Sequence, residues 1–271
     1  MTRDESYQLF RDQQVCVLIP TYNNAATIGK VIDDVMRYTN QIIVVNDGST
    51  DETTEIVSHY PELDVVTYGP NKGKGFALRT GFKRAVEAGY HYAISIDSDG
   101  QHYPDDLPKF LRALGAHPRA VIIGARNMNQ SSVPGKSSFG NNFSNFWFRL
   151  ETGIKVSDTQ SGYRLYPVKE IESMRFITRK YEFEIEVLVR AAWSGLEIIE
   201  VPVNVFYPKK EERVSHFRPF KDFTRISILN TFLVLITFLY IKPRDFFRSF
   251  KKKTSAKSSG NTYSTRPSLT R

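Results

Sequence analysis

An alternation of short apolar runs with segments of helical periodicity is the feature that most constrains the fold of this chain. Apolar runs of strand length occur at residues 15–19, 42–45, 65–66, 92–96 and 121–123. Between them, apolar residues recur at helical spacing, most clearly at 28–36 and 76–88. Continuous apolar runs separated by helices are typical of a mostly parallel sheet that is covered on both faces. We therefore predict a Rossmann-like α/β domain.

A polar cluster follows each of four of these predicted strands. The clusters are PTYNN at 20–24, NDGST at 46–50, DSDGQH at 97–102 and GARN at 124–127. Ligands of parallel α/β sheets bind beyond the carboxyl ends of the strands, which lie at one edge of the sheet. The sequence thus predicts one binding edge to which all four clusters contribute.

Two carboxylates one residue apart, Asp97 and Asp99, follow the predicted strand at 92–96. Like charges this close destabilise each other unless a cation lies between them. Carboxylate oxygens and the amide oxygen of Gln101 are hard ligands that suit Mg²⁺ or Mn²⁺, and such a partial shell leaves room for a diphosphate. The alternative is that these side chains cap the helix that begins near Pro104.

Other residues at the predicted edge have a functional and a structural interpretation. Asp47 could accept a hydrogen bond from a nucleobase or close an Asx turn on Gly48, and Tyr22 could stack on a base or pack within its loop. The stretch GPNKGKGFALRTG fails the spacing of a Walker phosphate loop. Lys72 or Lys74 within it could still reach a phosphate, or could simply be solvated.

Three arginines, Arg126, Arg164 and Arg213, are candidates for phosphate contacts, because a guanidinium presents a fixed fork of donors. Any one of them could instead be a surface arginine. Asp158 precedes Arg164 within SDTQSGYRLYP, and three glutamates at 182–186 fit either the polar face of a strand or a helix start. The chain has no HExxH or GxSxG motif, which argues against a zinc peptidase or a serine hydrolase.

Taken together, VLIPTYNNAATIGKVI, IIVVNDGSTDET, NKGKGFALRTGF and ISIDSDGQH resemble glycosyltransferase family 2 in order and spacing. The later SDTQSGYRLYP and YEFEIEVLVRA resemble the dolichyl- and polyprenyl-phosphate sugar transferases of that family, so the resemblance spans about residues 14–215. It implies a GT-A fold, a UDP- or GDP-linked sugar donor, a divalent cation and inverting transfer at the anomeric carbon.

The resemblance also implies roles for individual residues. The implied donor-binding residues are Pro20, Tyr22, Asn24, Asp47, Lys74, Asp97 and Ser98. The implied cation ligands are Asp97, Asp99 and Gln101, and the implied phosphate contacts are Arg126, Arg164 and Arg213. Two positions depart from the family pattern: Asn24 stands where the polyprenyl-phosphate enzymes usually have Glu, and Asn46 replaces the first of two Asp residues. These departures bear on the selection of base and donor.

The acceptor determines which chemistry is needed. A sugar hydroxyl must lose a proton, for which Asp158 is the candidate base, whereas a lipid phosphate is already an anion and needs only positioning by arginines such as Arg164. We expect a lipid-linked acceptor, polyprenyl phosphate. The alternatives are a glycan or glycolipid hydroxyl, an inactive relative that only binds sugar nucleotides, and a pyrophosphorylase, whose glycine-rich, arginine-containing first loop is missing here.

The C-terminal part of the sequence predicts contact with a membrane. Residues 226–241 are uncharged, which gives about 24 Å of helix, short of the roughly 30 Å hydrocarbon core of a bilayer. Residues 242–271 carry nine Lys and Arg and one acid, Asp245, which accounts for the net charge of +8. The remainder is neutral overall, so no basic groove for nucleic acid is expected there. We expect a helix that lies in the interface, with a core helix as the alternative.

These features give three predicted parts: a GT-A catalytic domain at 1–220, membrane-associated helices at 221–250 and a basic disordered tail at 251–271. The polar N-terminus has no apolar stretch of the kind found in secretory signals, and the single cysteine, Cys16, excludes an internal disulfide. We therefore expect the protein at the cytoplasmic face of a membrane.

Overall fold

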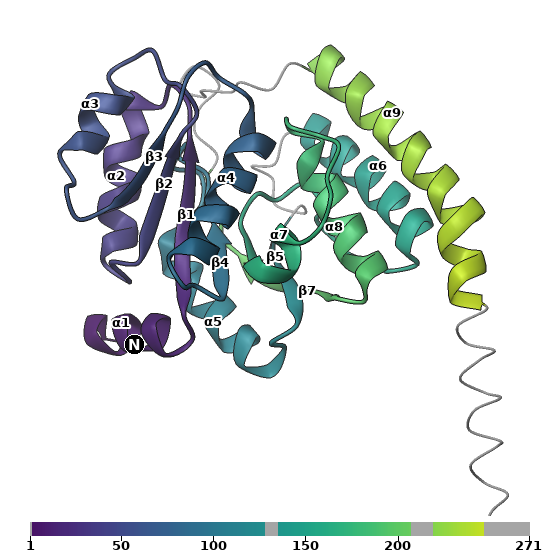
Figure 1. Ribbon diagram of the computed structural model, residues 1–271, viewed down its shortest axis with the longest axis horizontal. Coiled ribbons are helices and arrows are strands. Elements are labelled where there is room, and N and C mark those ends of the chain that lie inside the picture. The colour runs from purple at the N-terminus through teal and green to yellow at the C-terminus, as the bar shows by residue number, and fades with distance from the viewer. Residues whose placement is uncertain (1, 128–134, 207–218, 247–271) are drawn as a thin grey trace, which may run out of the picture.

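The computed structural model describes residues 2–127, 135–206 and 219–246; Arg213 and the predicted tail at 251–271 lie outside them. The described chain is built on a seven-stranded sheet with the order β3-β2-β1-β4-β6-β5-β7 (Figure 1). The strands are β1 (Val15–Thr21), β2 (Ile42–Asn46), β3 (Asp64–Thr67), β4 (Tyr92–Ser95), β5 (Ala120–Arg126), β6 (Arg164–Pro167) and β7 (Glu197–Val203).

Helices cover both faces of this sheet and extend beyond it. They are α1 (Arg3–Asp12), α2 (Ala25–Met36), α3 (Thr53–Ser58), α4 (Lys74–Glu87), α5 (Leu107–Ala116), α6 (Gly135–Thr152), α7 (Val168–Glu172), α8 (Phe183–Ser194) and α9 (Pro219–Ile236), with the short turns η1 (Pro104–Asp106) and η3 (Thr237–Ile241). The predicted α/β architecture is therefore confirmed.

The central strand β1 explains why the sheet needs helices on both sides. Every residue of β1 is buried, and successive side chains of a strand point to opposite faces. Cys16 and Leu18 belong to the core formed with α4, α7 and α8. Val17 and Ile19 belong to the core formed with α2 and α5. These two apolar layers thus fix the positions of the strand ends relative to one another.

Strands β6 and β7 are not among the strands that the sequence predicted, and β6 is the one that changes the direction of the chain within the sheet. Strand β6 pairs antiparallel with both β4 and β5, while every other pairing in the described sheet is parallel. Because β6 runs against both neighbours, β4 and β5 point the same way, and the predicted clusters after them do lie at one edge. The glutamates at 182–186, for which the sequence left strand or helix open, lie at the start of α8.

Helix α9 packs along α6 at the margin of the fold (Figure 1). One stripe of α9 and η3 is buried: Asp222, Ile226, Leu229, Asn230, Leu233, Thr237 and Ile241. The opposite side, which we call the outer face of α9, is exposed and apolar: Ile228, Phe232, Leu235, Phe238, Leu239 and Tyr240. Polar residues thus occur within the buried stripe and apolar residues outside it, the reverse of the usual surface helix.

The helical segment Asp222–Phe246 is long and apolar enough to cross a membrane, with a mean hydropathy of 1.7. However, it is attached to the domain near its far end as well, because Thr237 Oγ1 donates to the carbonyl of Glu151 at 3.2 Å. Arg244 Nη2 likewise donates to the carbonyl of Trp193 at 3.1 Å. Only 33% of the apolar stretch is buried, which is little for a helix of a hydrophobic core.

Candidate active site

The loops after β1, β2 and β4 are joined by hydrogen bonds at the carboxyl edge of the sheet. Asn24 Nδ2 donates to Ser98 Oγ at 2.7 Å, and the hydroxyl of Thr27 donates to the carbonyl of Ser98 at 2.6 Å. The backbone N–H of Asp47 donates to the last carbonyl of β1 at 2.9 Å. Ser98, the middle residue of the Asp-Ser-Asp motif, is therefore held in place by residues at the start of α2.

Lys74 lies between two carboxylates at this edge. Its Nζ is 2.7 Å from Asp97 Oδ1 and 3.1 Å from Glu184 Oε1, so the first residue of α4 meets the first turn of α8. Burial lowers the pKa of Lys74, but the charges of Asp97 and Glu184 outweigh burial and raise the pKa above its usual value. Burial raises the pKa of Asp97, but the charge of Lys74 outweighs it and holds this pKa below its usual value. The two groups form an ion pair at neutral pH.

The backbone of Gly162 packs directly against this ion-pair cluster. A Cβ added to Gly162 would lie 2.7 Å from Asp97 Oδ2 and 2.8 Å from Lys74 Nζ. The carbonyl of Gly162 is held in place because it accepts from the hydroxyl of Ser95 at 2.7 Å. Any side chain at this position would therefore displace the carboxylate or the ammonium.

Asp99 is suited to a bound cation. Burial and the charge of Asp97 raise the pKa of Asp99 to about 6, which means that its carboxylate is short of compensating positive charge. Asp97, Asp99 and the amide oxygen of Gln101 therefore fit a divalent ion. Within the described ranges, no three His, Cys, Asp or Glu side chains are grouped so that they could hold a metal by themselves. Phosphate oxygens would have to complete such a shell.

Asp47 organises the loop that precedes α4. Its buried carboxylate accepts hydrogen bonds from Asn71 Nδ2 at 2.9 Å and from the backbone N–H groups of Lys72 and Gly73, each at 2.8 Å. These bonds fix the backbone immediately before Lys74. The geometry thus links the acid after β2 to the lysine that meets Asp97 after β4.

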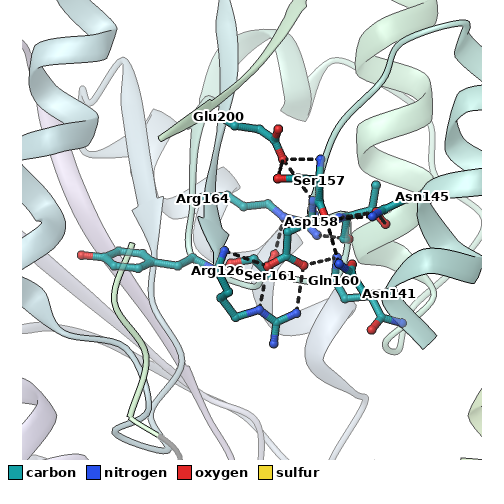
Figure 2. Close-up of polar contacts among 11 residues, drawn as sticks. Arg126, Asn141, Asn145, Ser157, Asp158, Gln160, Ser161, Arg164 and Glu200 are labelled. Carbon is teal, nitrogen blue, oxygen red and sulfur yellow. Dashed lines mark hydrogen bonds and ion pairs between the residues drawn. The ribbon is translucent and has the colours of Figure 1, made fainter. Parts of the chain in front are cut away.

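Arg126 and Asp158 form a buried ion pair at the end of β5 (Figure 2). Arg126 donates from Nε to Asp158 Oδ2 at 2.7 Å and from Nη2 to Oδ1 at 2.9 Å. The backbone N–H groups of Arg126 and Gln160 also donate to this carboxylate, at 3.1 and 3.2 Å. Both oxygens of Asp158 are thus engaged, and the orientation of the guanidinium is fixed.

Arg164 is fully buried and bonded to the protein itself. Its guanidinium donates to the carbonyls of Ser161 at 2.6 Å, Glu184 at 2.6 Å and Thr159 at 2.8 Å, and to the hydroxyl of Tyr166 at 3.2 Å. A phosphate could reach this guanidinium only by displacing these bonds. The arrangement instead ties β6 to the loop before it and to α8.

With this geometry in hand, comparison with known proteins identifies the family. The model of glycosyl transferase family 2 matches residues 16–172, which hold the edge loops, the acidic pair and the Arg126–Asp158 pair. The chain belongs to glycosyl transferase family 2. It is a glycosyltransferase by this membership, as its motifs predicted.

Several similar family 2 members are named for lipid phosphates. The UDP-N-acetylglucosamine–dolichyl-phosphate N-acetylglucosaminyltransferase of Methanococcus voltae is 30% identical over 218 residues, 72% of this chain and 87% of that protein. The polyprenol monophosphomannose synthase of Mycolicibacterium smegmatis is 29% identical over 205 residues, 71% of this chain and 77% of that protein. The undecaprenyl-phosphate mannosyltransferase of Micrococcus luteus is 28% identical over 70% of this chain and 83% of that protein.

Solved structures support the predicted GT-A architecture. Glucosyl-3-phosphoglycerate synthase from Mycobacterium tuberculosis, crystallised with Mn²⁺, UDP and phosphoglyceric acid, superposes with a TM-score of 0.64. The alignment covers 89% of this chain and 82% of that one at 22% sequence identity. At this identity the similarity concerns the fold.

The two departures from the family 2 pattern have defined surroundings in this structure. Asn46 is buried; its Nδ2 donates to Thr54 Oγ1 at 2.8 Å, and its Oδ1 accepts from the N–H of Ser49 at 3.0 Å. An amide donates to the threonine and accepts from the serine, whereas a carboxylate could keep the first contact only by accepting from the threonine hydroxyl. Asn24 makes the bond to Ser98 described above.

The remaining predicted site residues are distributed unevenly. Pro20 is buried within β1 opposite Val45, and Tyr22 is half-buried in the loop that follows β1. Arg213 falls outside the described residues. Sequence reasoning missed the role of Glu184, for which the only signal was an acid in the first turn of a helix.

His102 is a second residue that the sequence did not single out for this family 2 site. It is buried, and burial lowers its pKa to about 4, so the imidazole is neutral at physiological pH. Its ring contacts that of Tyr163 with 5.0 Å between centroids. Its Nδ1 makes no hydrogen bond within the described part of the chain.

Proposed function

We propose that this glycosyltransferase moves a sugar from a nucleotide-diphosphate donor to the phosphate of a polyprenyl lipid, with inversion at the anomeric carbon. Three relatives named for dolichyl, polyprenol or undecaprenyl phosphate support this class of acceptor. The observation that carries the choice is the state of Asp158, whose two oxygens both accept from Arg126.

The donor binds at the carboxyl edge of β1, β2 and β4 in this proposal. The nucleoside is lined by Pro20, Tyr22 and Asp47. Asn24 contributes on the diphosphate side, because it is hydrogen-bonded to Ser98 of the Asp-Ser-Asp motif. Asp97, Asp99 and Gln101 hold Mg²⁺ or Mn²⁺, which supplies positive charge to the diphosphate oxygens when bound. The ammonium of Lys74 holds the carboxylate of Asp97 in a single orientation toward that ion.

The leaving diphosphate gains negative charge as the bond to the sugar breaks, so preorganised positive charge favours the transition state over the ground state. Lys74 is such a charge, because its ammonium is buried and held by two carboxylates. Gly162 allows the backbone to approach this cluster without displacing it. Arg164 holds the loop of Gly162 in place and therefore positions the site without contacting phosphate.

The acceptor step requires positioning and no general base, because a phosphate oxygen is already anionic. Arg126 is the residue that we assign to the acceptor phosphate, since Asp158 fixes its guanidinium at the rim of the site. A sugar hydroxyl as acceptor, with Asp158 as base, is the second candidate. It requires Asp158 to leave a bidentate ion pair with Arg126 and two hydrogen bonds from backbone N–H groups, which disfavours it.

The outer face of α9 supports a peripheral or monotopic position on the membrane. Six large apolar side chains are exposed on it, and Lys242 and Arg244 follow directly in the chain. Since α9 packs against α6 through Phe223 near its start, and Thr237 is hydrogen-bonded to the domain just beyond its end, we propose that it lies along the interface and does not cross the bilayer. The body would then stand on the cytoplasmic face, where sugar nucleotides are made available.

Product analysis tests the proposed function. The purified protein would be incubated with a panel of UDP- and GDP-sugars, with polyprenyl phosphate or with glycolipid hydroxyl acceptors, and with Mg²⁺, Mn²⁺ or a chelator. We expect a lipid-linked monophosphate sugar of inverted configuration, formed only with a divalent ion. Product from hydroxyl acceptors alone would favour the second candidate, and donor binding with no product would favour an inactive relative.

A further inference from the structure

A cavity of about 950 Å³ lies between α6, the end of β5 and β7. Its lining combines four cations, one acid, five asparagines and one serine with five apolar residues. The cationic and acidic residues are Lys109, Arg126, Arg149, Lys155 and Glu200, and the asparagines are Asn127, Asn141, Asn142, Asn145 and Asn204. We call this the basic cavity. Figure 2 shows Arg126, Asn141, Asn145 and Glu200 grouped around Asp158 at its margin.

Two cations of the basic cavity already have carboxylate partners. Lys109 Nζ lies 2.6 Å from Asp106 Oδ1, and Arg126 pairs with Asp158. The side chains of Arg149 and Lys155, in contrast, are exposed and make no hydrogen bond or ion pair within the described ranges. They line the cavity as uncompensated positive charges.

Glu200, the one acid of the cavity lining, is hydrogen-bonded to the loop before β6. Its Oε1 accepts from the N–H and the hydroxyl of Ser157 at 2.7 and 2.9 Å and from the N–H of Asp158 at 3.0 Å. Glu200 therefore stabilises the loop that contains Asp158. The cavity is left with excess positive potential, which favours an anionic ligand.

An aromatic bridge connects the rim of the basic cavity to α9. Phe146 lines the cavity, is 61% exposed and contacts Trp147 with ring centroids 5.6 Å apart. Trp147 contacts Phe143 at 6.0 Å, and Phe143 contacts Phe223 of α9 at 5.2 Å. We call these four residues the aromatic bridge. It forms a continuous apolar path from a polar cavity toward the outer face of α9.

We propose that the basic cavity receives the phosphate end of the lipid acceptor and that the aromatic bridge guides its hydrocarbon chain toward α9; this rests on the proposed function. Arg149 and Lys155 contact the phosphate on the side opposite Arg126. Phe146 packs against the first isoprene units. A hydrocarbon chain that stayed in the cavity would desolvate its charged side chains at a cost in free energy, so the chain leaves where the exposed ring of Phe146 begins the apolar path.

The acceptor and the donor then bind at the ends of different strands. The donor-binding loops follow β1, β2 and β4, whereas the basic cavity lies at β5 and β7 on the other side of β6. Arg126 belongs to the cavity lining, and its partner Asp158 lies in the loop that leads to Gly162 beside Asp97. The basic cavity therefore meets the donor site at Arg126, whose guanidinium is fixed by Asp158.

Kinetics with a water-soluble acceptor test this proposal without dependence on a bilayer. The variants are Arg149→Gln, Lys155→Gln and their double, with geranyl phosphate as acceptor and the sugar nucleotide that the wild type turns over. We expect the acceptor KM to rise roughly fivefold to tenfold for each single variant, as for loss of a charge-assisted contact, with the donor KM unchanged. Lys83→Gln, on the exposed side of α4, is the matched control.

Chain length tests the aromatic bridge separately. Phe146→Ala should raise the KM of a long polyprenyl phosphate in detergent severalfold and leave the KM of isopentenyl phosphate, which has one isoprene unit, unchanged. Inorganic phosphate, as a competitor, distinguishes an anion site from a lipid site. If it inhibits as well as geranyl phosphate does, the route of the chain is overturned.

The outcomes separate this proposal from the proposed function. A wild type that forms no lipid-linked product overturns both. A wild type that forms product, with all cavity variants within twofold of its acceptor KM, overturns the basic cavity and leaves the proposed function standing. An equal rise of donor and acceptor KM would mean a disturbed fold and would also contradict a specific acceptor contact.

Discussion

The ammonium of Lys74 lies 2.7 Å from the carboxylate of Asp97, in a partly buried contact between the first residue of α4 and the loop after β4. The acidic pair of Asp97 and Asp99 is thus half neutralised by the protein itself. The second carboxylate, Asp99, keeps a raised pKa and is the one short of positive charge. A cation that binds here would therefore contact Asp97, which Lys74 holds in place, and Asp99, which is short of positive charge.

Removal of this lysine should destabilise the fold. In Lys74→Met, Asp97 and Glu184 lose their common cation. Their side chains are 25% and 12% exposed, so the cost is at or below the lower end of the about 3–5 kcal/mol for breaking a fully buried ion pair from one side. We expect the free energy of unfolding, measured by urea denaturation, to fall by about 3 kcal/mol, with loss of turnover. Lys83→Gln, whose ion pair with Glu87 is exposed, should change it by less than about 0.5 kcal/mol.

The fold tolerates no side chain at Gly162 without a change in the ion-pair cluster. A Cβ would lie 2.7 Å from Asp97 Oδ2, so Gly162→Ala should cost about 1–3 kcal/mol of stability and reduce kcat more than tenfold. Gly115→Ala is the control, since nothing lies within 4 Å of its Cβ and alanine favours a helix. Unchanged kcat in Gly162→Ala would mean that the cluster does not position the donor.

Buried Glu151 makes stability depend on pH. Burial raises its pKa to about 8, and neither carboxylate oxygen has a hydrogen-bond partner within the described ranges. The unfolded chain loses this proton near its ordinary pKa of 4.5, so the unfolded state binds fewer protons between pH 4.5 and 8. Stability should therefore fall with rising pH across this window, by about 1.4 kcal/mol per unit.

The variant Glu151→Gln separates the contribution of Glu151 to the pH dependence of stability from the contributions of all other titrating groups. The variant should gain stability relative to the wild type as the pH rises from 5 to 8, with the difference levelling off above pH 8. Urea denaturation at a series of pH values measures it. Parallel stability curves for the two proteins would show that Glu151 is ionised in the fold or has found a partner.

The pair of Arg126 and Asp158 distinguishes a positioning acid from a general base. If Asp158 only orients Arg126, Asp158→Asn and Arg126→Lys should both raise the acceptor KM, and both should leave hydrolysis of the sugar nucleotide unchanged. If Asp158 were a base, its variant alone would lose kcat by 10²-fold or more. Steady-state kinetics with varied acceptor separates these results.

The outer face of α9 should control membrane binding without controlling stability. Leu235→Glu with Leu239→Glu places two charges on side chains that are 54% and 77% exposed. We expect loss of co-sedimentation with anionic vesicles and a change in unfolding free energy below about 0.5 kcal/mol per site. Lys83→Gln, a charge change on the exposed side of α4 and away from α9, should bind vesicles as the wild type does.

The sequence predicted the binding edge because each cluster there follows an apolar run that can only be a buried strand. It could not predict the partner of Lys74, since Glu184 is 110 positions away in the chain and approaches only when α8 packs beside α4. It also missed β6, because a strand of four residues that begins with Arg164 has no apolar pattern. That arginine is buried because backbone carbonyls accept all its hydrogen bonds but one.

Titration of Mn²⁺ by calorimetry, with and without UDP or GDP, tests most directly whether the acidic edge completes its cation site with a donor diphosphate. We predict weak binding of Mn²⁺ alone, at least tenfold tighter binding with one of the nucleotides, and loss of that gain in Asp99→Asn. Equal affinity for Mn²⁺ with and without nucleotide, or an unchanged gain in Asp99→Asn, would contradict it.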